Sequence, residues 1–197
     1  MGIFITGLIQ SSSGTTALTV GLVRAGLMTL PQAIGIILGA NIGTTITSFL
    51  IGLKIKDYAL PIMALGAFLI FFTHKKKSKQ LGGVILGFGM LFYGLDIMGG
   101  ALKDLAKLPS FENALQSVGK YPVLGLMVGA LTTVIVQSSS ATIGILQELY
   151  TTGAIPLIGA IAIVFGDNIG TTVTAVFASI GGSVAAKRTA AAHVVFN

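Results

Sequence analysis

The chain has 197 residues, of which 53% are hydrophobic and only 9% are charged. A soluble domain usually carries about 25% charged residues, so this composition, with its mean hydropathy of +0.93, excludes a water-soluble protein. The net charge of +6 falls mostly in loops between apolar segments and does not indicate a nucleic-acid partner. Because cysteine is absent, disulfides and thiol chemistry are excluded as well. We therefore expect a multi-pass protein of the plasma or inner membrane, with the lipid bilayer as its surroundings.

The apolar segments predict an all-α integral membrane protein. Only helices and closed barrels satisfy their backbone groups in lipid, and these segments are too long for barrel strands of about 10 residues. Residues 103–122 mix charge with helical spacing, which is typical of an interfacial helix. The predicted membrane segments, in chain order, are 2–23, 32–53, 58–73, 81–102, 123–147 and 155–180.

Two polar motifs interrupt these segments, and both recur at one spacing. Gln10 begins "QSSS" and Gln137 begins its second copy, 127 positions later (137 − 10). Asn41 and Asn168 begin two copies of "NIGTT" at the same interval (168 − 41). Recurrence of two motifs in one register indicates an internal duplication.

The residue types in these motifs indicate binding of ions. Serine hydroxyls at the start of a helix, with its free backbone N–H groups and positive dipole end, favour an anion. In the "GANIGTT" and "GDNIGTT" blocks, a glycine break would free backbone carbonyls beside amide and hydroxyl oxygens, which are ligands for a small cation. Broken helices in matching positions of two repeats are typical of transporter substrate sites.

The charge of the motifs indicates that the two ions bind together. The four blocks contain no lysine or arginine, and Asp167 is their only acid. Neutral hydroxyls alone leave a large desolvation cost for a buried oxyanion, and a co-bound cation would offset it. The sequence therefore predicts symport.

Other interpretations of single residues stay open. Serine, threonine and glycine also pack transmembrane helices closely, as the scattered glycines of 82–100 would. Asp96 is either a functional acid at membrane depth or a solvated residue near the end of its segment. Asp167 has no acidic counterpart in the first repeat, where Ala40 occupies the matching position. Whether Asp167 contacts an ion stays open. The serines have no His or Lys base within their segments, so we do not expect an enzyme.

The paired motifs "QSSSGTT"/"GANIGTT" and "QSSSAT"/"GDNIGTT" resemble the signatures of the type II sodium-dependent phosphate cotransporter family. The resemblance implies sodium-driven transport of inorganic phosphate, two inverted repeats, a re-entrant QSSS hairpin in each repeat, and a broken transmembrane helix beside it. It places Ser11, Ser12, Ser13, Ser138, Ser139 and Ser140 around phosphate. It assigns Na⁺, the coupling ion, to Gln10, Asn41, Thr44, Thr45, Gln137, Asn168, Thr171 and Thr172, with Asp167 and Asp96 as further candidates.

The loop charges support inversion of the repeats. With both QSSS segments returning to their own side, three crossings separate them, and three is odd. One side then carries seven basic residues and no acid, namely Arg24, Lys75, Lys76, Lys77, Lys79, Lys187 and Arg188. The other carries five, Lys54, Lys56, Lys103, Lys107 and Lys120, mixed with acids. The excess of basic residues predicts that the loop 74–80 is cytoplasmic, between a first repeat at 1–73 and a second at 81–197.

The chain departs from the family pattern at its ends. Only nine residues precede Gln10, whereas residues 81–122 precede the second QSSS motif. We expect a shortened form or fragment that lacks flanking helices. The function predicted is therefore sodium–phosphate symport or the binding core of such a symporter. The alternatives are a symporter for another oxyanion and a non-transporting membrane subunit, and a homo-oligomer is compatible with each.

Overall fold

The structure is a computed structural model that describes residues 1–53, 55–105 and 107–197. Lys54, one of the basic residues in the topology prediction, lies outside the described residues. Every regular element in these three ranges is a helix, as predicted. The α-helices are α1 (Gly2–Ile9), α2 (Ser12–Arg24), α3 (Leu30–Ile51), α4 (Ala59–Phe72), α5 (Lys76–Leu105), α6 (Pro109–Lys120), α7 (Pro122–Val136), α8 (Ser139–Thr151), α9 (Leu157–Ser179) and α10 (Val184–Phe196), with a 3₁₀ turn, η1, at Lys56–Tyr58.

The helix bounds follow the internal repeat of the sequence. Helix α8 begins and ends 127 positions after α2, and α9 begins 127 positions after α3. In both halves a short helix (α1 or α7) packs along the longer third one (α3 or α9). The same local sequence has therefore produced the same three-helix unit twice.

The QSSS motifs form the break between two helices in each unit. Gln10 and Gln137 both end their helices in the left-handed conformation, with φ of 59° and 56°. The serine that follows is extended and caps the next helix: Ser11 Oγ accepts from Gly14 N at 3.0 Å, and Ser138 Oγ accepts from Ala141 N at 3.3 Å. A serine N-cap satisfies one of the free N–H groups at a helix start, which explains why α2 and α8 begin there.

The predicted breaks at "NIGTT" are wrong in the structure, where α3 and α9 run through these blocks without interruption. The glycines serve close packing instead. A Cβ on Gly43 would lie 2.9 Å from the backbone O of Ile3, and one on Gly170 would lie 2.6 Å from the backbone O of Ala130. Glycine at these positions lets α1 and α7 approach α3 and α9 backbone to backbone, as small residues do in membrane helices.

Within residues 1–53, 55–105 and 107–197, three helices are long and apolar enough to cross a membrane: α3, α5 and α9. Helices α6 and α7, bent by 114° at their junction, give a fourth crossing if they are counted as one span. The predicted crossing at 58–73 is only the 14-residue α4. At 1.5 Å per residue α4 reaches about 21 Å, which is short of the ~30 Å hydrocarbon core.

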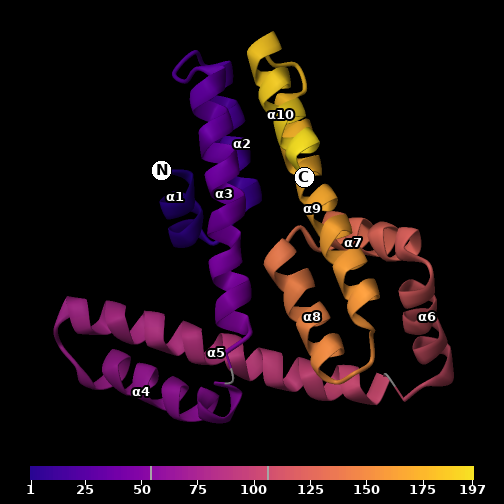
Figure 1. Cartoon of the computed structure of the whole chain (residues 1–197). Helices are drawn as coiled ribbons and strands as arrows, with labels where there is room; N and C mark the ends of the chain where they lie inside the picture. Colours follow the sequence, from indigo (N-terminus) through magenta and orange to yellow (C-terminus); the bar gives the residue numbers. More distant parts are fainter. Residues whose placement is uncertain (54, 106) are drawn as a thin grey trace.

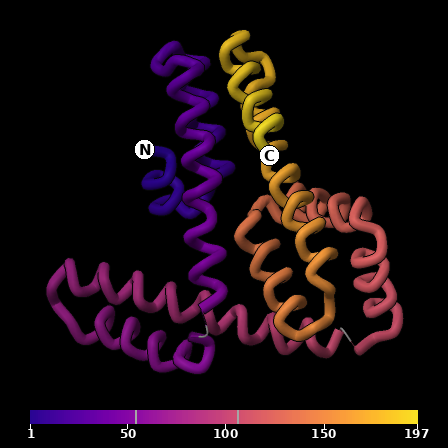
Figure 2. Tube along the Cα trace, in the orientation of Figure 1, coloured from indigo at the N-terminus to yellow at the C-terminus, as the bar shows by residue number. Residues whose placement is uncertain are grey.

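Figure 1 shows a bundle of helices and a helical hairpin that crosses its end. In the bundle, α2 and α10 each pack against both α3 and α9, and the hairpin is formed by α4 and α5 (Figure 2). Two apolar clusters fix the arrangement, one between α6, α8 and α9 and one where α3, α4 and α5 meet. Many large apolar side chains, such as Phe71 and Ile135, are exposed, as expected of a surface that faces lipid.

Candidate functional site

A polar cavity lies where the two repeats meet. Its volume is about 300 Å³, and α2 and α3 of the first repeat and α8 and α9 of the second contribute to its wall. Its polar lining residues are Ser12, Asn41, Thr44, Thr45, Ser48, Ser139, Asp167, Asn168 and Thr171. Residues that are more than 120 positions apart in sequence thus come together in one site.

Equivalent residues of the two repeats line the cavity together. Three of its residues in the first half have their counterparts, 127 positions later, in the second half: Ser12 with Ser139, Asn41 with Asn168, and Thr44 with Thr171. Ser12 and Ser139 are also the first residues of α2 and α8. Two helix N-termini therefore open onto the cavity, each with a hydroxyl, and this arrangement favours an anion.

The carboxylate of Asp167 breaks the equivalence of the two halves, since Ala40 occupies the matching position. Asp167 is fully buried. Its Oδ1 accepts a hydrogen bond from Thr133, and its Oδ2 has no partner among the described residues. A buried carboxylate oxygen without a partner is costly, and a cation in the cavity would relieve that cost.

The remaining serines of the two motifs have other positions. Ser11 and Ser138 use their hydroxyls as N-caps. Ser138 and Ser140 line a neighbouring cavity of about 410 Å³, together with Thr47 and residues of α5. Ser13, half-buried on α2, is not among the residues that line the polar cavity.

The motif glutamines, Gln10 and Gln137, lie outside the polar cavity and form hydrogen bonds within their own repeats. Oε1 of Gln10 accepts from Thr47, and Oε1 of Gln137 accepts from Thr174 at 3.1 Å. Their Nε2 atoms donate to Gly7 O and Val134 O, both at 2.6 Å. Each amide thus ties the helix break to the third helix of its own repeat.

Three further predicted residues differ in their position. Thr45 lines the cavity and donates to Ile42 O, whereas Thr172 is buried, donates to Ile169 O and does not line it. Asp96 is exposed on α5 and is not part of the lining either.

Sequence reasoning missed a buried hydroxyl pair in each repeat. Thr6 donates to Thr15 at 3.0 Å, and Thr133 lies 3.2 Å from Thr142 at the matching positions. The pairs join the helices on either side of each QSSS break. Since Thr133 follows Thr6 at the repeat interval, the alignment of the two halves contains the signal for both pairs.

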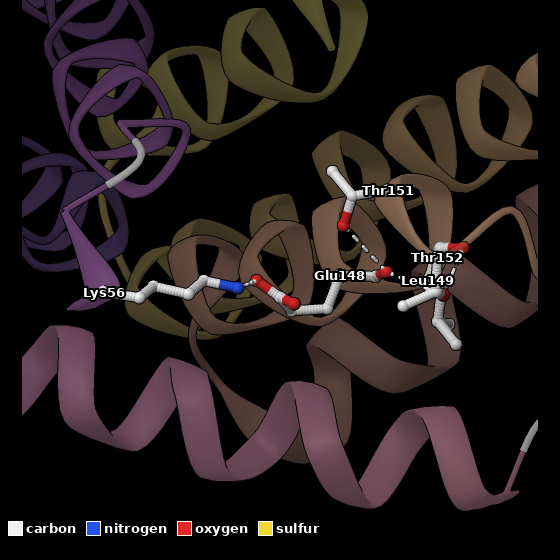
Figure 3. A network of polar contacts seen from close by, with 5 residues as sticks. All are labelled: Lys56, Glu148, Leu149, Thr151 and Thr152. Atoms are coloured by element: carbon white, nitrogen blue, oxygen red, sulfur yellow. Dashed lines mark hydrogen bonds and ion pairs between the residues drawn. The ribbon is translucent and has the colours of Figure 1, made fainter.

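A second missed feature is the partly buried ion pair between Lys56 and Glu148 (Figure 3). Lys56 comes from η1, after α3, and Glu148 from α8, so the pair joins the first repeat to the second. Along the same seam, Gln147 Nε2 donates to the backbone O of Ser48 at 3.1 Å. Gly99 of α5 gives the carboxylate room, because a Cβ there would lie 2.5 Å from Oε2 of Glu148.

Within the described residues, no three His, Cys, Asp or Glu side chains come together as metal ligands do. The oxygens available to a cation in the cavity are amide and hydroxyl oxygens together with Asp167. Hard oxygen ligands of this kind suit an alkali or alkaline-earth cation better than a transition metal.

The described part of the chain has three or four membrane-capable segments and a polar cavity lined by equivalent residues of two similar motifs, as a multi-pass membrane protein does. The model of the Na+/Pi-cotransporter family matches the chain twice, over residues 1–100 and 97–196. The chain belongs to this family. The resemblance of its paired motifs is thereby confirmed.

The curated relatives are bacterial and animal proteins. "Uncharacterized protein YqeW" of Bacillus subtilis is 39% identical over all of this chain, which spans 64% of that protein's length. "Putative inorganic phosphate export protein YjbB" of Escherichia coli is 28% identical over 99% of the chain, which spans 36% of it. Human "Sodium-dependent phosphate transport protein 2B" is 34% identical over 49% of the chain and 14% of its own length. No solved structure matches the chain significantly.

Proposed function

We propose that this chain forms the binding core of a sodium-coupled transporter of inorganic phosphate. The observation that carries the proposal is the cavity in which Ser12 and Ser139, Asn41 and Asn168, and Thr44 and Thr171 come together from two repeats. The family membership supports phosphate as the substrate and sodium as the coupling ion.

The phosphate is placed at the two helix starts. Ser12 and Ser139 donate hydroxyls there, and the first N–H groups of α2 and α8 have no intrahelical acceptors. The helix dipoles add about half a positive charge at each start. A tetrahedral oxyanion has enough acceptor oxygens to be shared by both helix starts, one from each repeat.

The sodium is placed beside Asp167. The described lining of the cavity holds no Lys, Arg or His, and its one ionisable side chain is this carboxylate. Phosphate and a buried carboxylate repel one another in a medium of low dielectric. A cation bound to Oδ2 of Asp167, with Asn168 and Thr171 supplying further oxygens, converts that repulsion into attraction and makes the binding of phosphate depend on the cation.

The topology proposed is two inverted repeats. Each helix break at Gln10–Ser11 and Gln137–Ser138 is assigned to a re-entrant hairpin, and the basic loop 74–80 to the cytoplasm, where Lys and Arg in short loops accumulate. The break geometry, shared by both halves, supports the hairpins. Because α4 is short, the crossing between α3 and α5 would need locally thinned lipid or flanking side chains that extend to the interface.

The direction of transport follows from the gradients and not from the site. A site that binds both ions can release them on either side of the membrane, so the same core can serve uptake or export. The relative from Escherichia coli is named for export and the human relative for sodium-dependent transport.

The test is phosphate binding to the detergent-purified protein in Na⁺ and in K⁺ at equal ionic strength, with sulfate as competitor. We expect binding that requires Na⁺ and that sulfate does not displace. Displacement by sulfate would move the assignment to another oxyanion. Binding of equal strength in K⁺ would contradict sodium coupling, and no binding in either cation would favour a non-transporting subunit.

A further inference from the structure

Helix α10 carries a histidine and an asparagine that no motif includes, and the asparagine contacts a residue of the cavity wall. The helix packs against α9, α2 and α3, and its end lies beside the middle of α3 (Figure 1). There the Nδ2 of Asn41 donates to Oδ1 of Asn197 at 3.2 Å. Asn41 is one of the residues that line the cavity, so α10 is connected directly to the site.

The orientation of Asn197 is itself fixed by His193. The Nδ2 of Asn197 lies 2.9 Å from the backbone O of His193 and 2.9 Å from its Nδ1. An amide nitrogen only donates, so Nδ1 accepts; in the neutral ring this puts the proton on Nε2, which has no hydrogen-bond partner among the described residues. His193 is fully buried, which holds the ring in place. With its nitrogen committed to His193, Asn197 can only present its oxygen to Asn41.

The fixed orientation of Asn197 determines the orientation of the Asn41 amide. One N–H of its Nδ2 donates to Asn197, which holds the amide in one orientation, and its Oδ1 accepts no hydrogen bond among the described residues. An amide that could rotate freely would present nitrogen or oxygen to a ligand. The chain from His193 through Asn197 fixes one orientation, in which Oδ1 has no protein donor and is available as a ligand for a hard cation.

The second repeat has no such restraint. His193 and Asn197 correspond, at the repeat interval, to Gly66 and Ile70 of α4, neither of which offers a side-chain hydrogen bond. Helix α4 packs on α5 instead of entering the bundle as α10 does. Among the described residues, no side-chain hydrogen bond holds Asn168. The two asparagines that share one position in the repeat therefore differ in how firmly they are held.

We propose that His193 and Asn197 are positioning residues that fix the Asn41 amide with its oxygen toward the cavity, as a ligand for the coupling cation. This inference rests on the proposed function for the identity of the cation, and on the hydrogen bonds alone for the positioning. It assigns Asn41 to the cation and not to the phosphate, because a carbonyl oxygen repels an oxyanion.

The first arm of the test is independent of transport. The chain has four asparagines, at 41, 113, 168 and 197, so selective ¹⁵N-asparagine labelling gives four pairs of side-chain amide signals. In His193→Leu we expect the signals of both Asn197 and Asn41 to shift, with Asn113 unchanged. His193→Asn, which keeps an acceptor in place of Nδ1 and adds one amide of its own, should restore the signals of Asn197 and Asn41. A shift that stops at Asn197, or none, would overturn the inference.

The second arm measures the Na⁺ concentration for half-maximal phosphate binding. In Asn197→Leu the restraint is lost, and the Na⁺ concentration for half-maximal phosphate binding should rise roughly 3- to 10-fold, the effect of one hydrogen bond. The phosphate affinity at saturating Na⁺ should stay within about twofold of the unmodified protein's. Val195→Ala, at a side chain 86% exposed on the same helix, is the matched control and should change neither. An unchanged Na⁺ requirement in Asn197→Leu would overturn the inference. If the unmodified protein binds phosphate without Na⁺, the proposed function fails and the first arm alone decides the positioning.

Discussion

The ion pair between Lys56 and Glu148 should stabilise the contact between the two repeats, and its two partners should not be equally important. Their side chains differ in exposure, 28% for Lys56 and 8% for Glu148. In Lys56→Met the carboxylate remains buried beside Gly99 without its counter-charge, and removal of one partner of a buried pair costs roughly 3–5 kcal/mol. In Glu148→Gln the lysine can turn toward solvent, so the loss should be about 1 kcal/mol, as for a partly exposed pair.

The assay is the free energy of unfolding in mixed detergent micelles, followed by far-ultraviolet circular dichroism because the chain has no tryptophan. We expect Lys56→Met to be the less stable single variant. The double variant Lys56→Met/Glu148→Gln should recover part of that loss, because it no longer buries an uncompensated charge. If Lys56→Met is as stable as Glu148→Gln, or if the double variant is less stable than both, the reasoning from burial is refuted.

Two further predictions concern the cavity and its walls. Asp167→Asn should raise the Na⁺ concentration needed for phosphate binding by about tenfold or more, because a charge-assisted contact is worth about 1.5–3 kcal/mol. Asp96→Asn, at an exposed position, is the control and should have no effect in the same titration. Gly170→Ala should lower the free energy of unfolding by about 1–3 kcal/mol through overpacking against Ala130, while Gly87→Ala, with open space around it, should leave it unchanged or higher.

The duplication made most of the cavity predictable. Because equivalent positions of a repeat take equivalent places, the sequence alone predicted that serines, asparagines and threonines of both halves serve one site. The cavity contains three such pairs, among them Asn41 with Asn168. Their division between phosphate and sodium stays a prediction.

What the repeat could not predict falls into two kinds. A glycine that breaks a helix and a glycine that admits a neighbouring backbone look alike in sequence, so the breaks expected at Gly43 and Gly170 were wrong. Contacts without a counterpart in the other half are also invisible to repeat analysis. Asn41 and Asn197 lie 156 positions apart, and Lys56 and Glu148 lie 92 apart. The packing of α10 against α3 brings the first pair together, and the packing of η1 on α5, which also contacts α8, brings the second pair together.

The central claim is that one phosphate is held jointly by both repeats. The most direct measurement is the stoichiometry and affinity of phosphate binding in saturating Na⁺ for the unmodified protein, Ser12→Ala and Ser139→Ala. The account predicts one phosphate per chain, with each single variant weakening that same site, because Ser12 and Ser139 line one cavity. Two phosphates per chain, one of them lost in each variant and the other bound as before, would contradict it.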